Sequence, residues 1–187
     1  RDRGQRGERS GEEGAVLDVL SHGRLDFGVG RGHPFPGVYE SFQISPDESR
    51  ARFDEALDVL VGAWTQEPFA YQGRFFQIRP ISVVPRPIQH PHPPLFVAAG
   101  SPETYAATGR RGLGILIPGH VQPTDFLREH LVSYRQAGEA AGHRDRLKVT
   151  LLLPIYVAER QRQAEEEPEA SVMDYFQVLG ELLSGPL

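Results

Sequence analysis

Hydrophobic residues recur along the chain in two patterns: short apolar runs, and longer stretches whose apolar positions lie three or four residues apart. Short runs predict strands, within residues 25–32 and at 95–99, 113–117 and 149–157. Helical spacing predicts helices at residues 16–22, 46–65, 102–111 and 123–141, and two more within 158–187. Pro154 predicts that the last strand is interrupted or bent there. Strands that alternate with helices indicate an α/β fold with parallel strands.

Between the first and second of these strands, the sequence predicts a small hairpin and a proline-rich extended segment. Residues 69–78 predict a hairpin with Gln72 and Gly73 at its tip. The proline-rich residues 80–94 predict an extended segment that holds His90 and His92. An H-x-H spacing can bind zinc, but there is no third ligand nearby, so we expect two exposed histidines and no metal site.

Two predicted helices begin with a serine followed by a proline. Ser45 and Glu48 fit a capping box at the start of the helix at 46–65. Ser101 fits an N-cap directly after the apolar run at 95–99. A strand therefore meets a helix N-terminus at Gly100 and Ser101, where free N–H groups and the helix dipole favour an anion. A simple cap without a ligand is the alternative interpretation.

The run at 25–32 ends in a turn with glycine at 28, 30 and 32 around Arg31. Glycine lets the backbone approach a ligand, and a guanidinium suits a phosphate, although a turn with a solvated charge is the commoner use of such residues. A dinucleotide-binding fingerprint would need glycine where His33 stands, and a P-loop would need Gly-Lys-Ser/Thr, which the turn lacks. The turn is therefore a candidate phosphate site, but it is neither a dinucleotide-binding fingerprint nor a P-loop.

Composition narrows the class of protein. The 187 residues, 39% of them hydrophobic, suit one core, and residues 1–13 are so polar and charged that we expect them to be disordered or frayed before a domain at 14–187. A net charge of −5 argues against nucleic acid as a partner. The sequence has no cysteine, which excludes disulfides and thiolate sites, and no apolar run long enough for a membrane span. We expect a cytoplasmic protein without a membrane partner.

The predicted strands and helices fit two architectures, an open doubly wound sheet or part of a (β/α)8 barrel. In both, ligands gather at the carboxyl ends of the strands. Arg31, then Gly100 with Ser101, and then residues 118–120 follow three successive strands. These residues should therefore lie along one rim.

Four motifs resemble, in order and spacing, the bacterial luciferase-like flavin-dependent monooxygenases: residues 17–32, 50–57, 84–89 and 93–101. The resemblance extends from about residue 17 to 157. It implies a (β/α)8 barrel, reduced FMN from a flavin reductase, molecular oxygen and a small organic substrate. Arg31 matches the family arginine that holds the flavin phosphate, and Ser101 with the Gly100 N–H matches the second half of that grip. A deazaflavin coenzyme, used in the same superfamily without oxygen, would fit the same grip.

The sequence is short for such a barrel, which typically needs about 250 residues. We expect an incomplete TIM-type barrel with about four parallel strands and the helices between them. Because the family's catalytic groups lie on the early strands, the resemblance assigns no catalytic residue here. A truncated, non-catalytic fragment is therefore an alternative to an enzyme. Open sheet edges favour association, and the resemblance makes a homodimer plausible.

Overall fold

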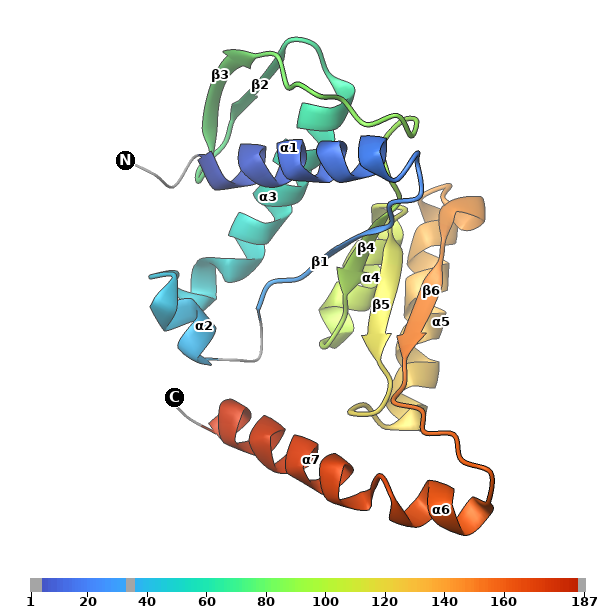
Figure 1. Cartoon of the computed structure of the whole chain (residues 1–187). Coiled ribbons are helices and arrows are strands. Elements are labelled where there is room, and N and C mark those ends of the chain that lie inside the picture. Colours follow the sequence, from blue (N-terminus) through green and yellow to red (C-terminus); the bar gives the residue numbers. More distant parts are fainter. Residues whose placement is uncertain (1–4, 33–35, 185–187) are drawn as a thin grey trace.

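A computed structural model describes residues 5–32 and 36–184 as alternating helices and strands (Figure 1). In chain order the elements are α1 Gln5–Leu20, β1 Phe27–Val29, α2 Pro36–Ser41, α3 Pro46–Thr65, β2 Phe69–Gln72, β3 Gln77–Ile81, β4 Leu95–Ala98, α4 Pro102–Arg110, β5 Gly114–Pro118, α5 Thr124–Ala140, a 3-10 turn at Arg144–Arg146, β6 Val149–Leu152, α6 Gln161–Glu166 and α7 Glu169–Ser184. The predicted order of strands and helices is confirmed, and α2 is an additional helix that the sequence did not predict.

Four strands form one parallel sheet in the order β1-β4-β5-β6. The register pairs Val29 with Val97, Val97 with Ile115, and Ile115 with Val149. Apart from β2 and β3, which lie outside this sheet, each strand pairs in parallel with the next strand along the chain, as in a (β/α) barrel. Strands β2 and β3 make a separate antiparallel hairpin. The α/β fold with four parallel strands is thus as predicted.

One face of the sheet is covered by helices, and its core has two parts. Helices α1 and α3 pack on β1 and β4 around Leu60, Trp64 and Val97. Helices α4 and α5 pack on β5 around Tyr105, Ile115 and Tyr134. Both tyrosines are fully buried, and their hydroxyls donate to Gln122 Oε1 at 2.7 Å and to the Leu113 carbonyl at 2.8 Å. These bonds satisfy the polar groups that burial would otherwise leave unpaired.

The start of the described chain differs from the prediction. Residues 5–13 are not disordered but belong to α1, which crosses the boundary expected at residue 13; residues 1–4 lie outside the described part. The reason is tertiary: Trp64 Nε1 donates to the Gly11 carbonyl at 2.7 Å, and a Cβ at Gly14 would lie 2.8 Å from the Trp64 ring. Small residues let α1 lie directly against α3, so packing supplies what the polar composition lacks.

Strand β6 stops at Leu152, before Pro154, because proline cannot donate to the ladder, so the interruption predicted there is confirmed. Two smaller predictions change. The hairpin turn spans residues 73–76 rather than Gln72 and Gly73 alone. Of the two histidines in the proline-rich segment, His90 is exposed, but His92 is half-buried, with its ring centroid 6.1 Å from that of Trp64 and Nδ1 2.7 Å from the Pro93 carbonyl.

Candidate functional site

The first half of the candidate site is Arg31, at the carboxyl end of β1. Its Nη1 donates to Ser49 Oγ at 3.2 Å, and Ser49 Oγ in turn donates to the Pro46 carbonyl at 2.7 Å. Ser49 is buried in the first turn of α3. The first turn of α3, which begins at Pro46 as predicted, thus orients the Arg31 guanidinium. Most of the N–H donors of Arg31 remain available for an anion.

The second half of the site is the junction of β4 and α4. Ser101 stands at the N-cap position as predicted, but its hydroxyl makes no capping bond. It lies 3.1 Å from Thr104 Oγ1 instead, and Arg50 Nη2 reaches Thr104 Oγ1 at 3.1 Å and Ser101 Oγ at 3.5 Å. The first turn of α4 therefore carries two hydroxyls and a guanidinium beside its open N–H groups.

The Gly100 backbone is open to a ligand. A Cβ at this position would meet nothing within 4 Å. Within the described residues, the Gly100 N–H forms no hydrogen bond. A glycine here lets a bulky anion reach the backbone N–H.

The two halves create one electropositive site. Burial lowers the pKa of Arg31, and the neighbouring charge of Arg50 lowers it further. Among the described residues, neither guanidinium has a carboxylate within ion-pair distance. An anion with several oxygens would reduce the electrostatic repulsion between the two guanidiniums, and a phosphate is such an anion.

Glu103 shows that this site attracts negative charge. Its pKa is lowered by its own backbone N–H and by the Ser101 hydroxyl, and then by Arg50 and Arg31. An exposed carboxylate of the chain itself thus senses the helix N-terminus and both guanidiniums. Arg31, Arg50, Gly100, Ser101 and Thr104 offer donors of the kind that bind a phosphomonoester, and we call this candidate site the phosphate grip.

Two members of the phosphate grip were not assigned from the sequence. Arg50 belongs to one of the motifs that carry the family resemblance, but nothing local distinguishes it from Arg52, the other arginine of α3. Thr104 is one turn after Ser101. The spacing of Ser101 and Thr104, which places both side chains on one face of α4, was the only signal in the sequence.

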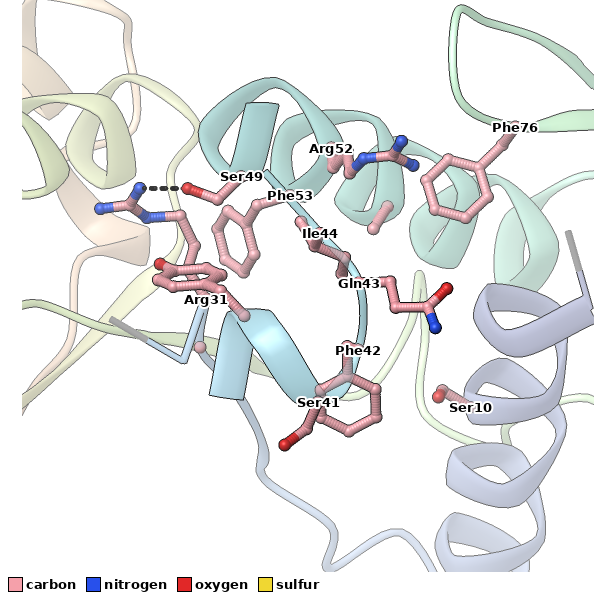
Figure 2. Close-up of a pocket in the computed structure, with 13 residues that line it drawn as sticks. Ser10, Arg31, Ser41, Phe42, Gln43, Ile44, Ser49, Arg52, Phe53 and Phe76 are labelled. Atoms are coloured by element: carbon pink, nitrogen blue, oxygen red, sulfur yellow. Dashed lines mark hydrogen bonds between the residues drawn. The ribbon is translucent and has the colours of Figure 1, made fainter. Parts of the chain in front are cut away.

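A cavity of about 510 Å³ adjoins the phosphate grip (Figure 2). Arg31 and Ser49 lie at one end, and Phe76 and Ser10 lie at the other. Phe42, Ile44 and Phe53 supply apolar walls between them. The Tyr39 hydroxyl is buried there and has no hydrogen-bond partner among the described residues.

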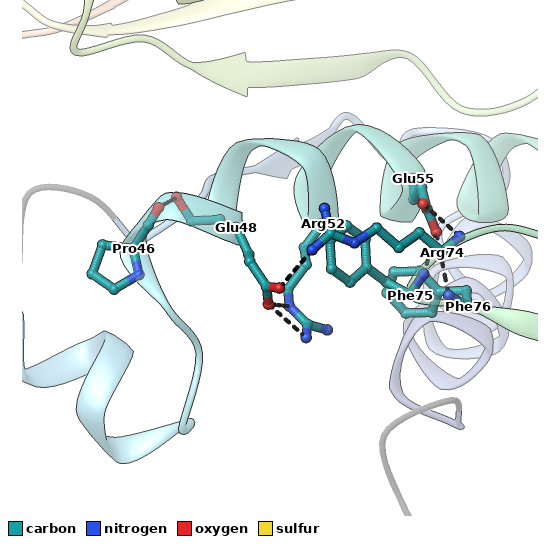
Figure 3. Close-up of polar contacts among 8 residues, drawn as sticks. Pro46, Glu48, Arg52, Glu55, Arg74, Phe75 and Phe76 are labelled. Carbon is teal, nitrogen blue, oxygen red and sulfur yellow. Dashed lines mark hydrogen bonds and ion pairs between the residues drawn. The ribbon is translucent and has the colours of Figure 1, made fainter.

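The backbone of the hairpin tip that carries Phe76 is held by the carboxylate of Glu55 (Figure 3). Glu55 accepts from the N–H groups of Arg74, Phe75 and Phe76 at 2.8, 2.9 and 3.2 Å. Partial burial raises the pKa of Glu55, but these N–H groups outweigh it, and the pKa lies below its ordinary value. Glu55 therefore fixes the wall of the cavity from α3.

Glu48 does not close the capping box predicted with Ser45. The Ser45 side chain makes no capping bond, and the Glu48 carboxylate binds Arg52 at 3.0 Å and Arg74 at 2.9 Å instead (Figure 3). Two guanidiniums offer charge-assisted bonds that a single backbone N–H cannot match. The helix still begins at Pro46, because proline suits the first helical position.

The third rim segment, at residues 118–120, lies one strand beyond the phosphate grip. The Gly119 N–H donates to the Leu152 carbonyl at 3.1 Å, so this segment is joined to the end of β6. His120 Nε2 lies 2.7 Å from the Tyr175 hydroxyl of α7. Within the described residues, no three histidine, cysteine or acidic side chains gather to hold a metal, and no helix could cross a membrane.

A family model, a solved structure and a curated relative all indicate the same protein family for this chain. The family model of the luciferase-like monooxygenases matches residues 9–181. The crystal structure of monooxygenase RslO1 from Streptomyces bottropensis superposes with a TM-score of 0.87 at 31% identity, over 96% of this chain and 55% of that one. The oxygenase component of flavin-dependent trigonelline monooxygenase from Acinetobacter baylyi is 28% identical over 158 residues, 82% of this chain and 42% of that protein.

A deazaflavin enzyme is also similar. The F420-dependent glucose-6-phosphate dehydrogenase of Amycolatopsis mediterranei is 29% identical over 129 residues, which is 68% of this chain and 38% of that protein. The chain spans less than half the length of the curated relatives it matches, from 28% to 48% for the first four.

Proposed function

The chain belongs to the luciferase-like monooxygenase family, and we propose that it is the flavin-phosphate-binding part of a monooxygenase that uses reduced FMN and molecular oxygen on a small organic substrate. The observation that carries this proposal is that Arg50 contacts Ser101 and Thr104 at the start of α4, while Arg31, bound to the neighbouring Ser49, interacts electrostatically with Arg50. FMN ends in a phosphate that this donor set fits. The flavin supplies the oxygen chemistry when bound, and the chain's own residues bind and orient it.

Within the phosphate grip, each group has a separate task. The planar guanidinium of Arg31 donates from the end of β1, and that of Arg50 donates from α3. Ser101, Thr104 and the Gly100 N–H donate from the start of α4, where the helix dipole adds to the attraction. Anchoring the phosphate in this way fixes one end of the flavin on the rim, and the rest of the molecule can then extend along the carboxyl ends of the strands.

The reduced flavin comes, in this proposal, from a separate flavin reductase. The trigonelline relative is named as an oxygenase component, which supports a two-component system. The homodimer and the cytoplasmic location expected from the sequence stay predictions. A deazaflavin-dependent oxidoreductase is the second candidate, and the similarity to the F420-dependent dehydrogenase favours it. Its coenzyme would use the same phosphate grip.

The test compares FMN with riboflavin, which lacks the phosphate. Flavin fluorescence titrations should show that the wild-type chain prefers FMN, and that Arg31→Ala and Arg50→Ala each weaken FMN binding by about 1.5–3 kcal/mol while leaving riboflavin binding unchanged. Arg128→Ala is the matched control, because Arg128 is an exposed arginine of α5 far along the chain from the phosphate grip.

Equal binding of FMN and riboflavin by the wild-type chain would contradict the phosphate grip. The same titration with a deazaflavin coenzyme separates the two candidate functions, because tight binding of that coenzyme together with weak binding of FMN would favour the second. If Arg31→Ala and Arg50→Ala both lose FMN affinity but Arg128→Ala does not, the two arginines of the grip are assigned by direct measurement.

A further inference from the structure

His120 stands at the carboxyl end of β5 and contacts α7. Its Nε2 lies 2.7 Å from Tyr175 Oη, and the two ring centroids are 5.5 Å apart. Its other nitrogen, Nδ1, is buried and has no hydrogen-bond partner among the described residues. A buried imidazole nitrogen without a partner is uncommon, because such groups are almost always satisfied in folded proteins.

A cavity of about 380 Å³ lies beside this histidine, and we call it the His120 cavity. It lies between the end of β6 and α7, which passes across the carboxyl ends of the strands (Figure 1). Besides His120 and Tyr175, its walls are mainly carbon, from Leu152, Leu153, Pro154, Ser171, Val172 and Phe176. A cavity of this size, apolar with few polar groups, is typical of a small-molecule site.

The His120 cavity belongs to the same rim as the phosphate grip. The grip includes Gly100 and Ser101, which follow β4, and β4 pairs directly with β5. His120 is the second residue after the end of β5. The Gly119 N–H before it donates to the carbonyl of Leu152, which lines the cavity. A flavin anchored at the grip and extended along the rim would therefore approach this cavity.

The hydrogen bond to Tyr175 determines what His120 can offer. The 2.7 Å contact fits either atom as the donor, and we assign Tyr175 Oη as the donor to Nε2 because a phenol hydroxyl is a stronger donor than an imidazole N–H. With this assignment the ring proton lies on Nδ1. The buried Nδ1–H then needs an acceptor, and none of the described residues provides it. A ligand oxygen that accepts a hydrogen bond would satisfy it.

We propose that the His120 cavity binds the substrate, and that the substrate is a mainly apolar molecule with one hydrogen-bond-accepting oxygen, such as a carbonyl, held by the Nδ1–H of His120. His120 is thus a specificity-determining residue, and Tyr175 is a positioning residue that keeps the proton on Nδ1. The inference rests on the proposed function, since it places this molecule beside the flavin.

The experiment uses two probes of the same size and shape, acetophenone and α-methylstyrene, which differ in having a carbonyl oxygen or a methylene group. The chain is labelled with 15N in its seven histidines, and the His120 imidazole signals are followed by NMR during titration. Acetophenone should shift the His120 Nδ1 signal. His120→Leu should lower the ratio of acetophenone to α-methylstyrene affinity by about five- to tenfold.

Tyr175→Phe provides a second variant, because it keeps the apolar wall and removes only the hydroxyl. It should lower the same ratio by a smaller factor and change the 15N shifts of His120 to those of mixed tautomers. Tyr156→Phe is the matched control: Tyr156 donates to Glu167 outside the cavity, and its variant should bind both probes as the wild-type chain does.

The proposal is overturned if neither probe shifts the His120 signals, or if both variants keep the wild-type affinity ratio. FMN titration of the same samples separates this result from a failure of the proposed function. Normal FMN binding without any response to the probes would reject the His120 cavity alone. A probe response without FMN binding would reject the flavin assignment and keep the cavity as a binding site.

Discussion

At the scale of single residues, Asp18 has the most completely satisfied buried carboxylate among the described residues. It is fully buried in α1, and its oxygens accept from the N–H groups of Ile88 and Gln89 at 2.8 and 3.0 Å and from Gln89 Nε2 at 2.7 Å. Gln89 Nε2 also donates to the Leu25 carbonyl at 2.8 Å. Two of the motifs that carry the family resemblance are therefore in direct contact.

Asp18→Asn should lower the free energy of unfolding by about 2–4 kcal/mol, because its amide NH2 would face either the backbone N–H groups of Ile88 and Gln89 or Gln89 Nε2, and would leave those donors unpaired. Urea denaturation measures this change. Asp26→Asn is the control, since Asp26 is exposed, and its change should stay within about 0.5 kcal/mol. Equal stabilities of the two variants would show that the Asp18 bonds contribute little.

At the scale of elements, helices α4 and α5 approach each other through glycine. A Cβ at Gly109 would collide with the backbone carbonyl oxygen of Tyr134, and a Cβ at Gly138 would lie 3.1 Å from the Gly109 carbonyl oxygen. Tyr134, with its hydroxyl at the Leu113 carbonyl, is fully buried at this contact. The contact fixes the position of α4 relative to the sheet, and with it the position of Ser101 and Thr104 in the phosphate grip.

Gly109→Ala should destabilise the chain by about 1–3 kcal/mol, because the added methyl group meets backbone that cannot move aside easily. Gly180→Ala in α7 is the matched control: a Cβ there would meet nothing within 4 Å, so the higher helix propensity of alanine should leave the stability equal or slightly greater. Thermal unfolding followed by circular dichroism compares the two. A stable Gly109→Ala variant would mean that α4 and α5 can separate.

At the scale of the whole molecule, the last strand leaves a large apolar surface exposed. Ile155 and Val157, which follow β6, are 81% and 84% exposed, and Leu151 and Leu153 are each 48% exposed. Among the described residues, strand β6 is also an edge of the sheet and pairs with β5. Exposed apolar groups beside an open strand edge favour association.

We therefore expect the chain to associate as its concentration rises from about 1 to 100 μM, a range in which exposed apolar surface drives such contacts. Light scattering after size-exclusion chromatography would show the change in mass. Replacing both Ile155 and Val157 with lysine should reduce association, whereas Val84→Lys, at a residue 74% exposed elsewhere, should not. A monomer throughout this range would contradict the prediction.

The sequence alone determined the features that depend on neighbours along the chain. Apolar spacing located the strands and helices, prolines set the starts of α3 and α4, and the strand–glycine–helix order placed Arg31 and Ser101 on one rim. These features are local: a period of two or of three to four residues, or a proline that fixes its own backbone, acts within one element.

Only the tertiary structure decided which distant residues meet. Arg50 contacts Ser101, 51 positions later, and Trp64 turns a polar segment into α1 by binding Gly11, 53 positions earlier. Glu48 binds Arg74 instead of the expected helix cap, and His120 contacts Tyr175. Such pairs arise because packing brings together groups whose separation in sequence carries no signal, and the strongest available partner then displaces the local one.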